Sequence, residues 1–398
     1  MTDSETLLVT VSGPDRPGIT SGLMGLLEAA GATVDDVEQV VVRGRLVLGL
    51  VTTLPLNATG AGTDIRKELL LFGHDRGLSV DYEPTDPEPS ARSIANIVTV
   101  MGPTVSPADF ATVSSTIASA GGNIDRIVQL ARYPVTAYEL IVEHADEPTL
   151  RATLASVSSE TGLDIALQRQ DLGRRAQRLV VLDVDSTLIQ DEVIELLATR
   201  AGCEDRVREI TRRAMTGELD FEEALRARVA MLAGLTLDDL DAARADVRLT
   251  PGARTFVRTL RRLGYRIAIV SGGFTYFTDA LKSELGLDHA FANELEIVDG
   301  TLTGSLTGPI VDRARKADLL REVAAAEGIA LDQTVAVGDG ANDLDMLATA
   351  GLGVAFNAKP IVRDAAHTSV SVPYLDAILS VLGVRRSEVE AADLADRD

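Results

Sequence analysis

The sequence predicts an α/β domain with a parallel sheet and a helical insertion, preceded by two small α+β domains of the ferredoxin-like type. Two stretches of the front half repeat the order β-α-β-β-α-β. In the back half, continuous apolar runs alternate with helical stretches, which is typical of a parallel sheet covered on both faces. A length of 398 residues is also more than one core usually organises.

The first repeat begins with a β-rich apolar run, Leu7–Val11, followed by the turn-rich loop Gly13–Gly18. Ile19–Ala30 is expected to be a helix that ends at Gly31. Two strands, a helix and a last strand follow, at Thr33–Val42, Arg45–Thr53, Ile65–Arg76 and Leu78–Tyr82. We place this first domain at residues 1–84. The stretch Glu83–Arg92, rich in Pro and acidic residues, is expected to be a linker.

The second repeat has the same order and is placed at residues 93–172. Its expected elements are Asn96–Met101, Phe110–Ala120, Ile124–Ala131, Ala137–Glu143, Pro148–Thr161 and Asp164–Gln168. Repetition of one small unit predicts two paired small domains rather than one large domain.

The back half, residues 173–398, is expected to contain the parallel sheet. Its predicted strands are Leu179–Asp183, Arg266–Ser271, Val335–Gly338 and Gly353–Ala355. Between Leu188 and Thr250 we predict no strand, because that stretch is rich in Glu, Arg, Ala and Leu at helical spacing. We therefore expect a helical cap over about residues 189–249, inserted after the first strand.

Composition narrows the classes of function. A formal net charge of −22 argues against a nucleic-acid partner, which would require basic surface. One cysteine allows no internal disulfide and fits a reducing compartment, and four scattered histidines with it build no zinc site. The start carries acids where a signal peptide carries basic residues, and no apolar run approaches a membrane span. We expect a cytoplasmic protein without membrane contact.

Polar residues follow three of the predicted strands. The first strand ends in Asp183-Val184-Asp185-Ser186-Thr187, the next in Ser271-Gly272-Gly273, and a later one in Gly338-Asp339-Gly340-Ala341-Asn342-Asp343. Lys316 lies at the start of a helical run, Lys316–Glu327. Because ligands bind at the carboxyl ends of strands in open α/β sheets, we expect these residues to share one pocket.

Such a pocket suits phosphoryl transfer. Of two carboxylates two residues apart, one can attack phosphorus while the other passes a proton. Acids from a separate strand supply oxygen ligands for Mg²⁺, which offsets the repulsion between two anions. Ser271, Lys316 and backbone N–H groups near Gly272 can hold phosphate oxygens. Each motif alone has a simpler explanation, such as a turn, a helix cap or a solvated charge; their order and their placement after apolar strands favour the site.

Residues 178–383 resemble the phosphatase branch of the haloacid dehalogenase superfamily, since all four of its motifs are matched by the residues just named. The resemblance implies that Asp183 is a nucleophile that becomes an aspartyl-phosphate. It implies that Asp185 protonates the leaving oxygen and then activates water. Mg²⁺ would be bound by Asp183, the backbone carbonyl of Asp185, and Asp339, with Asp343 nearby.

The predicted cap resembles that of the phosphoserine phosphatases over Met215–Val229. By that resemblance, Glu192 would hold a substrate ammonium and Arg228 a substrate carboxylate. Met215 and Phe221 would line the apolar wall of the lid, and Asn342 would assist phosphate or ligand binding. Spacing alone does not separate Arg228 from Arg226, and both could be exposed helix charges.

The implied reaction is Mg²⁺-dependent hydrolysis of O-phospho-L-serine to L-serine and phosphate, the last step of L-serine biosynthesis. Two alternatives stay open: a phosphatase of another small metabolite, and an amino-acid-sensing regulatory protein with a degenerate phosphatase half. The intact set of Asp183, Asp185, Lys316 and Asp339 argues against the second alternative.

The two front repeats resemble ACT domains, which are small modules that bind amino acids. In the first, Asp15 could meet an ammonium, and backbone N–H groups after Gly18 could receive a carboxylate. The second departs from this pattern, since Thr104 stands in place of the Asp and the Pro-Gly pair is absent. The resemblance implies L-serine as an effector and a homodimer formed through these domains; a role in dimerisation alone stays open.

Overall fold

The structure is a computed structural model that describes residues 4–55, 61–86, 95–171, 174, 176, 178–215 and 218–396. Part of the expected linker, residues 87–92, lies outside this description, as do residues 93, 94, 172 and 173 at the expected domain boundaries. The chain divides into two compact units, Met1–Arg92 and Ser93–Asp398. No helix within the described residues has the length and apolar character needed to cross a membrane.

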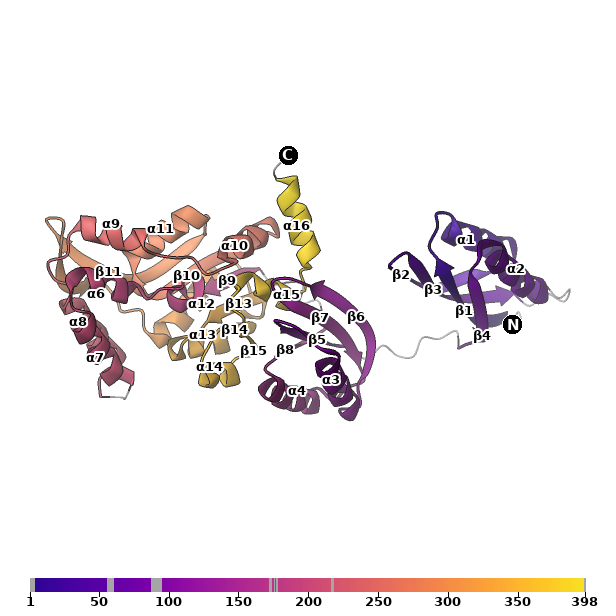
Figure 1. Cartoon of the computed structure of the whole chain (residues 1–398), viewed down its shortest axis with the longest axis horizontal. Coiled ribbons are helices and arrows are strands. Elements are labelled where there is room, and N and C mark those ends of the chain that lie inside the picture. The colour runs from indigo at the N-terminus through magenta and orange to yellow at the C-terminus, as the bar shows by residue number, and fades with distance from the viewer. Residues whose placement is uncertain are drawn as a thin grey trace. The chain divides into compact units, whose positions relative to one another are not determined.

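The first unit has the β-α-β-β-α-β order that the sequence predicts (Figure 1). Its elements are β1 (Ser4–Pro14), α1 (Ile19–Ala29), β2 (Thr33–Val42), β3 (Arg45–Pro55), α2 (Ala61–Arg76) and β4 (Ser79–Pro84). The strands form an antiparallel sheet in the order β2-β3-β1-β4. Alternate residues of β1 and β3 are buried in one core with residues of both helices, so the period of two in the sequence becomes the two faces of the sheet.

The second unit begins with a second domain of the same order. Its elements are β5 (Asn96–Gly102), α3 (Pro107–Ser119), β6 (Asn123–Ala131), β7 (Thr136–Glu143), α4 (Glu147–Thr161) and β8 (Asp164–Arg169), with the sheet order β6-β7-β5-β8. Ser106 and Asp109 form a reciprocal capping box that starts α3.

This second domain shares a core with the rest of its unit. Met101, Leu130 and Ala137 lie in the same buried cluster as residues of the large sheet. Polar contacts join the two parts as well: Asp164 Oδ2 accepts from the backbone N–H of Ser371 at 2.7 Å, and Gln168 Nε2 donates to the Val381 carbonyl at 3.1 Å. Every residue of β5 is buried. The helices α3 and α4 cover one face of this strand, and the rest of the second unit covers the other.

The large domain is built on a seven-stranded sheet in the order β12-β11-β10-β9-β13-β14-β15. The strands are β9 (Leu179–Leu182), β10 (Arg266–Phe274), β11 (His289–Val298), β12 (Thr301–Thr307), β13 (Thr334–Gly338), β14 (Leu352–Phe356) and β15 (Thr368–Val370). All neighbouring pairs are parallel except β11 with β12. The predicted parallel sheet is therefore confirmed, with β11, β12 and β15 in addition to the predicted strands.

Helices cover both faces of this sheet (Figure 1). One face carries α10 (Ala253–Arg262) and α11 (Thr275–Leu285); the other carries α12 (Arg313–Ala326), α13 (Leu344–Thr349) and α14 (Pro360–Ala365). Along β9, Val180 and Leu182 lie in the first core, and Leu179 and Val181 in the second. A strand buried on both faces reads as a continuous apolar run, which explains why β9 could be predicted. The chain closes with α15 (Ile378–Val381) and α16 (Arg386–Ala395).

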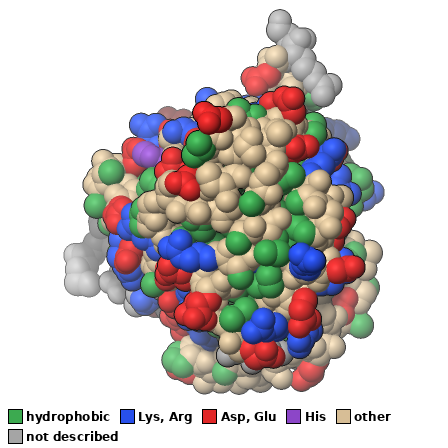
Figure 2. Space-filling view, turned by 90° about the vertical axis from the view of Figure 1, so that its left-hand side faces the viewer, with side chains coloured by type: hydrophobic (Ala, Val, Ile, Leu, Met, Phe, Trp, Pro, Cys, Tyr) green, Lys and Arg blue, Asp and Glu red, His purple; other side chains and the backbone are tan. Residues whose placement is uncertain are grey.

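The segment between β9 and β10 is helical, as the sequence predicts. After the turn η1 (Val184–Leu188) come α6 (Val193–Ala201), α7 (Glu204–Met215), α8 (Phe221–Ala230) and α9 (Leu237–Ala245). The two chain segments that lead into and out of this cap pair with each other: Ile189 and Leu249 form an antiparallel bridge, and the Gln190 N–H donates to the Arg248 carbonyl at 2.9 Å. On the face of the molecule shown in Figure 2, acidic, basic and hydrophobic side chains are interspersed. Mixed charges of this kind give a weaker long-range field than a patch of one sign.

Candidate active site

The site begins where the central strand β9 ends. Asp183 follows β9 and donates its backbone N–H to the Val337 carbonyl of β13 at 2.8 Å, so its position is fixed by the sheet. The chain then turns sharply: Ser186 has a left-handed φ of 58°, which is uncommon for a residue other than glycine. This turn brings Asp183 and Asp185, two residues apart, into the same buried region. Backbone outliers of this type cluster at functional sites.

Lys316 makes the strongest charged contacts of the site. Its side chain is only 1% exposed, and Nζ donates to Asp183 Oδ1 and to Asp343 Oδ1, each at 2.7 Å. Burial favours the neutral amine, but the two carboxylates outweigh it and raise the pKa of Lys316. For Asp183, burial and the neighbouring Asp343 raise the pKa, and Lys316 opposes them. The lysine therefore favours the ionised form of Asp183 that a nucleophile requires.

Asp185 has different partners from Asp183. Its Oδ1 accepts from the backbone N–H of Val193, the first residue of α6, at 2.8 Å, and its Oδ2 accepts from Ser271 Oγ at 2.8 Å. Ser271 Oγ in turn accepts from the Gly273 N–H at 2.7 Å. Burial raises the pKa of Asp185, and the hydrogen bonds from Val193 and Ser271 counteract it. A carboxyl group with a raised pKa is suited to give and take a proton.

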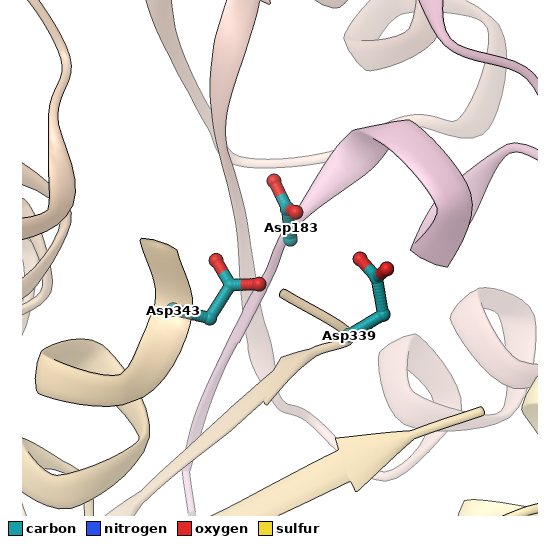
Figure 3. Close-up of side chains that lie close together, drawn as sticks. All are labelled: Asp183, Asp339 and Asp343. Atoms are coloured by element: carbon teal, nitrogen blue, oxygen red, sulfur yellow. The ribbon is translucent and has the colours of Figure 1, made fainter. Parts of the chain in front are cut away.

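The side chains of Asp183, which follows β9, and of Asp339 and Asp343, which follow β13, lie close together (Figure 3). One carboxylate oxygen from each lies within 4.8 Å of the others, so the three acids could hold a metal ion. Burial and the charge of Asp343 raise the pKa of Asp339 to about 6. Thr187 Oγ1 orients Asp339 by donating to its Oδ1 at 3.3 Å. Three clustered carboxylates, of which Lys316 contacts only Asp183 and Asp343, offer the oxygen ligands that a hard divalent ion prefers.

The residues expected to recognise the rest of the substrate lie on the cap side of the site. Glu192 Oε1 accepts from Ser186 Oγ at 2.8 Å. Burial and the charge of Asp185 raise the pKa of Glu192 to about 7. Arg228 is half-buried, and burial lowers its pKa while the charges of Glu192 and Asp185 counteract that. Glu192 and Arg228 are thus electrostatic neighbours, which the sequence alone does not show.

The structure separates the two cap arginines that spacing leaves equal. Arg226 is exposed and forms an ion pair with Glu222 one turn away on α8. Arg228 is half-buried, is influenced by the charge of Glu192, and donates from Nε to the Ala224 carbonyl at 3.2 Å. The geometry favours Arg228 as the residue available to an anionic group.

The remaining expected residues are placed as follows. Phe221 begins α8, and a methyl group added at Gly272 would lie 3.5 Å from its ring, so the cap lies close to the Ser271–Gly273 loop. Asn342 lies in the short turn η3 (Ala341–Asp343), with its side chain beside Gly340. Met215 ends α7, but its side chain lies outside the described residues.

Asp15 and Gly18 lie in the first unit, in the loop before α1. Gly18 has a φ of 92° and caps α1 without a side-chain hydrogen bond, and the Asp15 N–H donates to the Gly44 carbonyl at 2.9 Å.

Two residues that support the site, Thr250 and Asn293, were not expected from the sequence. Thr250 Oγ1 donates to the Thr187 carbonyl at 2.7 Å and so supports the turn after β9. Asn293, on β11, contacts the backbone of Gly272 and Gly273. Neither residue belongs to a recognisable motif, and β11 itself was not among the predicted strands.

Comparisons with known proteins agree with this geometry. A family model described as haloacid dehalogenase-like hydrolase matches residues 180–348, and two described as ACT domain match residues 5–83 and 95–168. A phosphoserine phosphatase of Streptomyces coelicolor is 57% identical over 99% of this chain and 96% of its own length. The phosphoserine phosphatase SerB2 of Mycobacterium tuberculosis is 48% identical over 98% of this chain and 96% of its own length.

Solved structures show the same relationship. A probable phosphoserine phosphatase from Vibrio cholerae aligns over 72% of this chain and 86% of its own, with a TM-score of 0.59 and 39% identity. A HAD family hydrolase from Salmonella enterica serovar Typhi aligns over 70% of this chain and 95% of its own, with a TM-score of 0.62 and 32% identity. The identities of 57% and 48% to the Streptomyces and Mycobacterium enzymes over almost the whole length show that the chain belongs to the phosphoserine phosphatase family, with a haloacid dehalogenase-like hydrolase domain and two ACT domains.

Proposed function

We propose that this protein hydrolyses O-phospho-L-serine to L-serine and phosphate, the last step of L-serine biosynthesis. The observation that carries the proposal is the buried contact of Lys316 with Asp183, beside Asp185 and Ser271, in a chain of this family. A buried carboxylate held by a lysine and a second carboxylate with a raised pKa are the two groups that this hydrolysis needs.

Asp183 is the proposed nucleophile. A carboxylate oxygen of Asp183 forms a bond to phosphorus as the bond from phosphorus to the serine oxygen breaks. Asp185 gives its proton to that leaving oxygen, so L-serine departs as the alcohol. Asp185 then takes a proton from water as the water attacks the aspartyl-phosphate, which releases phosphate and restores Asp183. Ser271 and Lys316, which contact Asp185 and Asp183 in the structure, would hold phosphate oxygens when substrate is bound.

Mg²⁺ is the proposed cofactor, held by Asp183, Asp339 and the backbone carbonyl of Asp185, with Asp343 close by. When bound, the ion offsets the repulsion between the anionic nucleophile and the anionic phosphate. Burial and the charge of Asp343 raise the pKa of Asp339 to about 6, although Lys316 and Thr187 oppose them. A divalent cation bound there would further favour the ionised form.

Glu192 and Arg228 are the proposed clamps for the amino acid. Glu192 would accept from the substrate ammonium, and Arg228 would donate to its carboxylate. Phe221 and Met215 would form the apolar wall of the lid, Gly272 would offer its N–H to phosphate, and Asn342 would assist ligand binding. For Phe221 and Gly272 the support is their proximity, since a Cβ at Gly272 would lie 3.5 Å from the Phe221 ring; for Glu192 and Arg228 it is the interaction of their charges.

The test is phosphate release from a panel of phosphate monoesters, measured with and without Mg²⁺. We expect phosphoserine to give the highest kcat/KM and the removal of Mg²⁺ to abolish turnover. A preference for an unrelated sugar or nucleotide phosphate would contradict the proposed substrate. Because Asp183→Asn cannot attack phosphorus, that variant serves as the inactive control.

The ACT domains are proposed to join two copies of the chain and to bind L-serine. The strand β2 lies at the edge of its sheet and is exposed along its whole length, with Val40 54% and Val42 60% exposed. An exposed apolar edge strand is a template for pairing with a second strand. We expect Val42→Lys to shift the protein to monomer in sedimentation velocity; an unchanged dimer would place the interface elsewhere.

Asp15 and Gly18 mark the proposed effector site. Asp15 would meet the ammonium of L-serine, and N–H groups at the start of α1 would receive its carboxylate. Isothermal titration of the Asp15→Ala variant, set beside the unaltered protein, tests this. Serine that binds equally to both would refute the assignment. The cytoplasm stays our expected location, on the single cysteine in the sequence.

A further inference from the structure

The pairing of β10 with β11 is interrupted at the Ser271–Gly273 loop. The strands are in register at Val270 with Phe291 and again at Phe274 with Asn293, with a shift between these pairs. Three residues, Ser271-Gly272-Gly273, therefore face a single residue of β11. A bulge of this kind takes backbone groups out of the ladder, and bulges are common beside active sites.

The side chain of Asn293 takes the place of the missing strand partner. Its Nδ2 donates to the Gly272 carbonyl at 2.8 Å and to the Gly273 carbonyl at 3.3 Å. Its Oδ1 accepts from the backbone N–H of Val311 at 2.8 Å. The amide orientation is fixed by these partners, because a flipped amide would set its oxygen against two carbonyl groups.

Asn293 thereby ties two parts of the active site to each other. Gly272 and Gly273 belong to the loop of Ser271, and Val311 lies in the segment that leads into α12, the helix of Lys316. Asn293 is 1% exposed, so these hydrogen bonds are formed away from water. These hydrogen bonds stabilise one arrangement of the two segments, because any other arrangement would leave buried polar groups without a partner and incur a desolvation cost.

The contact with Gly272 also determines where the Ser271 hydroxyl points. In a trans peptide the Gly272 carbonyl and the Gly273 N–H point in opposite directions. With the carbonyl held by Asn293, the N–H is aimed at Ser271 Oγ, which it reaches at 2.7 Å. That bond occupies a lone pair of Oγ and leaves its hydrogen to donate to Asp185 Oδ2 at 2.8 Å.

We propose that Asn293 is a positioning residue for the phosphatase reaction: it holds the Ser271–Gly273 loop in the shape that binds phosphate and aligns Ser271 with Asp185. The inference rests on the proposed function. Asn293 acts through backbone groups and is not itself a catalytic residue.

The test variant is Asn293→Asp. It keeps the shape of the side chain and an acceptor for the Val311 N–H, but it removes the donor to both carbonyls. Steady-state kinetics would be measured on phosphoserine and on an aryl phosphate, together with competitive inhibition by inorganic phosphate. Because a displaced phosphate loop affects the part that all these ligands share, we expect kcat to fall about 10- to 100-fold on both substrates alike. The inhibition constant of phosphate should rise as well.

The matched control is Asn96→Asp, the same change at another buried asparagine, 4% exposed, on β5. Both variants are expected to lower the thermal midpoint, but only Asn293→Asp should change kcat and phosphate inhibition. If Asn293→Asp does not fold, Asn293→Ser, which adds no charge, is subject to the same comparison.

Two results are decisive. A folded Asn293 variant with kcat and phosphate inhibition within about twofold of the unaltered enzyme would overturn the inference, because loss of a positioned donor costs far more than that. Equal kinetic losses in the Asn96 control would overturn it too, by showing a general effect on stability. Unaltered enzyme that turns over the aryl phosphate but not phosphoserine would instead refute the proposed substrate, and Asn293 would still be judged on the aryl phosphate.

Discussion

Replacing Lys316 by Met tests the charge arrangement at the heart of the site. Met fills the space of the lysine stem but leaves Asp183 and Asp343, whose side chains are 4% and 0% exposed, without their shared cation. Removing one partner of a buried ion pair costs about 3–5 kcal/mol. At roughly 2–4 °C per kcal/mol for a large domain, the thermal midpoint of the second unit should fall by about 6–20 °C.

The assay is thermal unfolding in the presence of a chelator, since a bound metal would stabilise the folded state and mask the loss. The control is Lys359→Met, because Lys359 is exposed and its replacement should cost less than about 0.5 kcal/mol. The double variant Lys316→Met/Asp343→Asn removes both a cation and an anion, so it should recover part of the lost stability.

The loss should also depend on pH. Burial and Asp343 already raise the pKa of Asp183, and Lys316 opposes them, so removal of Lys316 should raise that pKa further. An acid whose pKa is higher in the folded state than in the unfolded state holds more protons when folded, so stability falls as pH rises between the two values. The deficit of Lys316→Met should therefore be smaller at pH 5 than at pH 8. A deficit below about 2 °C at pH 8 would refute the reasoning, since the predicted cost is several-fold larger.

Three further predictions concern substrate and metal. Arg228→Ala should lower kcat/KM for phosphoserine by about 10- to 100-fold and change the turnover of an aryl phosphate little, whereas Arg226→Ala should change neither. Equal losses on both substrates in Arg228→Ala would contradict its role in binding the carboxylate. Because burial raises the pKa of Glu192 to about 7, kcat/KM for phosphoserine should fall as pH drops below 7. Glu192→Gln should remove this step from the pH profile, and an unchanged profile would exclude Glu192 as the group that binds the substrate ammonium. Asp339→Asn should raise the Mg²⁺ concentration needed for half-maximal activity at least about tenfold, and an unaltered Mg²⁺ titration would place the metal elsewhere.

Much of the fold is visible in the sequence because its signals are local. The strand β9 is a continuous apolar run that ends in two acids, and its position in the centre of the sheet explains both features. The two β-α-β-β-α-β units could be predicted because apolar residues alternate along their strands and glycines mark the ends of their helices. Asp183, Asp185, Ser271 and Asp339 could be expected to share one pocket because the carboxyl ends of parallel strands lie at one edge of the sheet. Lys316 lies on α12, and its contact with Asp183 is known from the structure alone.

The hairpin of β11 and β12 was not among the predicted strands, although a signal exists. Asp299-Gly300 joins the two strands, with φ values of 48° and 76°, and this dipeptide is typical of a tight hairpin turn. The sequence does not single out Asn293, since its role depends on lying in β11 opposite a bulge in β10.

Other features depend on contacts that spacing does not determine. Arg226 and Arg228 are two residues apart, and only the direction of each side chain from α8 separates them. The burial of both faces of β5 results from the large domain that packs on it, and the sequence of β5 does not name that partner. Such long-range packing decides which polar residues become buried and thereby changes their pKa values.

The central claim is that phosphate passes through a covalent bond to Asp183. The most direct measurement is rapid acid quenching of the enzyme during turnover of radiolabelled phosphoserine in the presence of Mg²⁺, followed by peptide mapping. We predict label on the peptide that contains Asp183, lost on treatment with hydroxylamine, and no label on Asp183→Asn. Rapid turnover with no label on that peptide, or equal label on Asp183→Asn, would contradict the account.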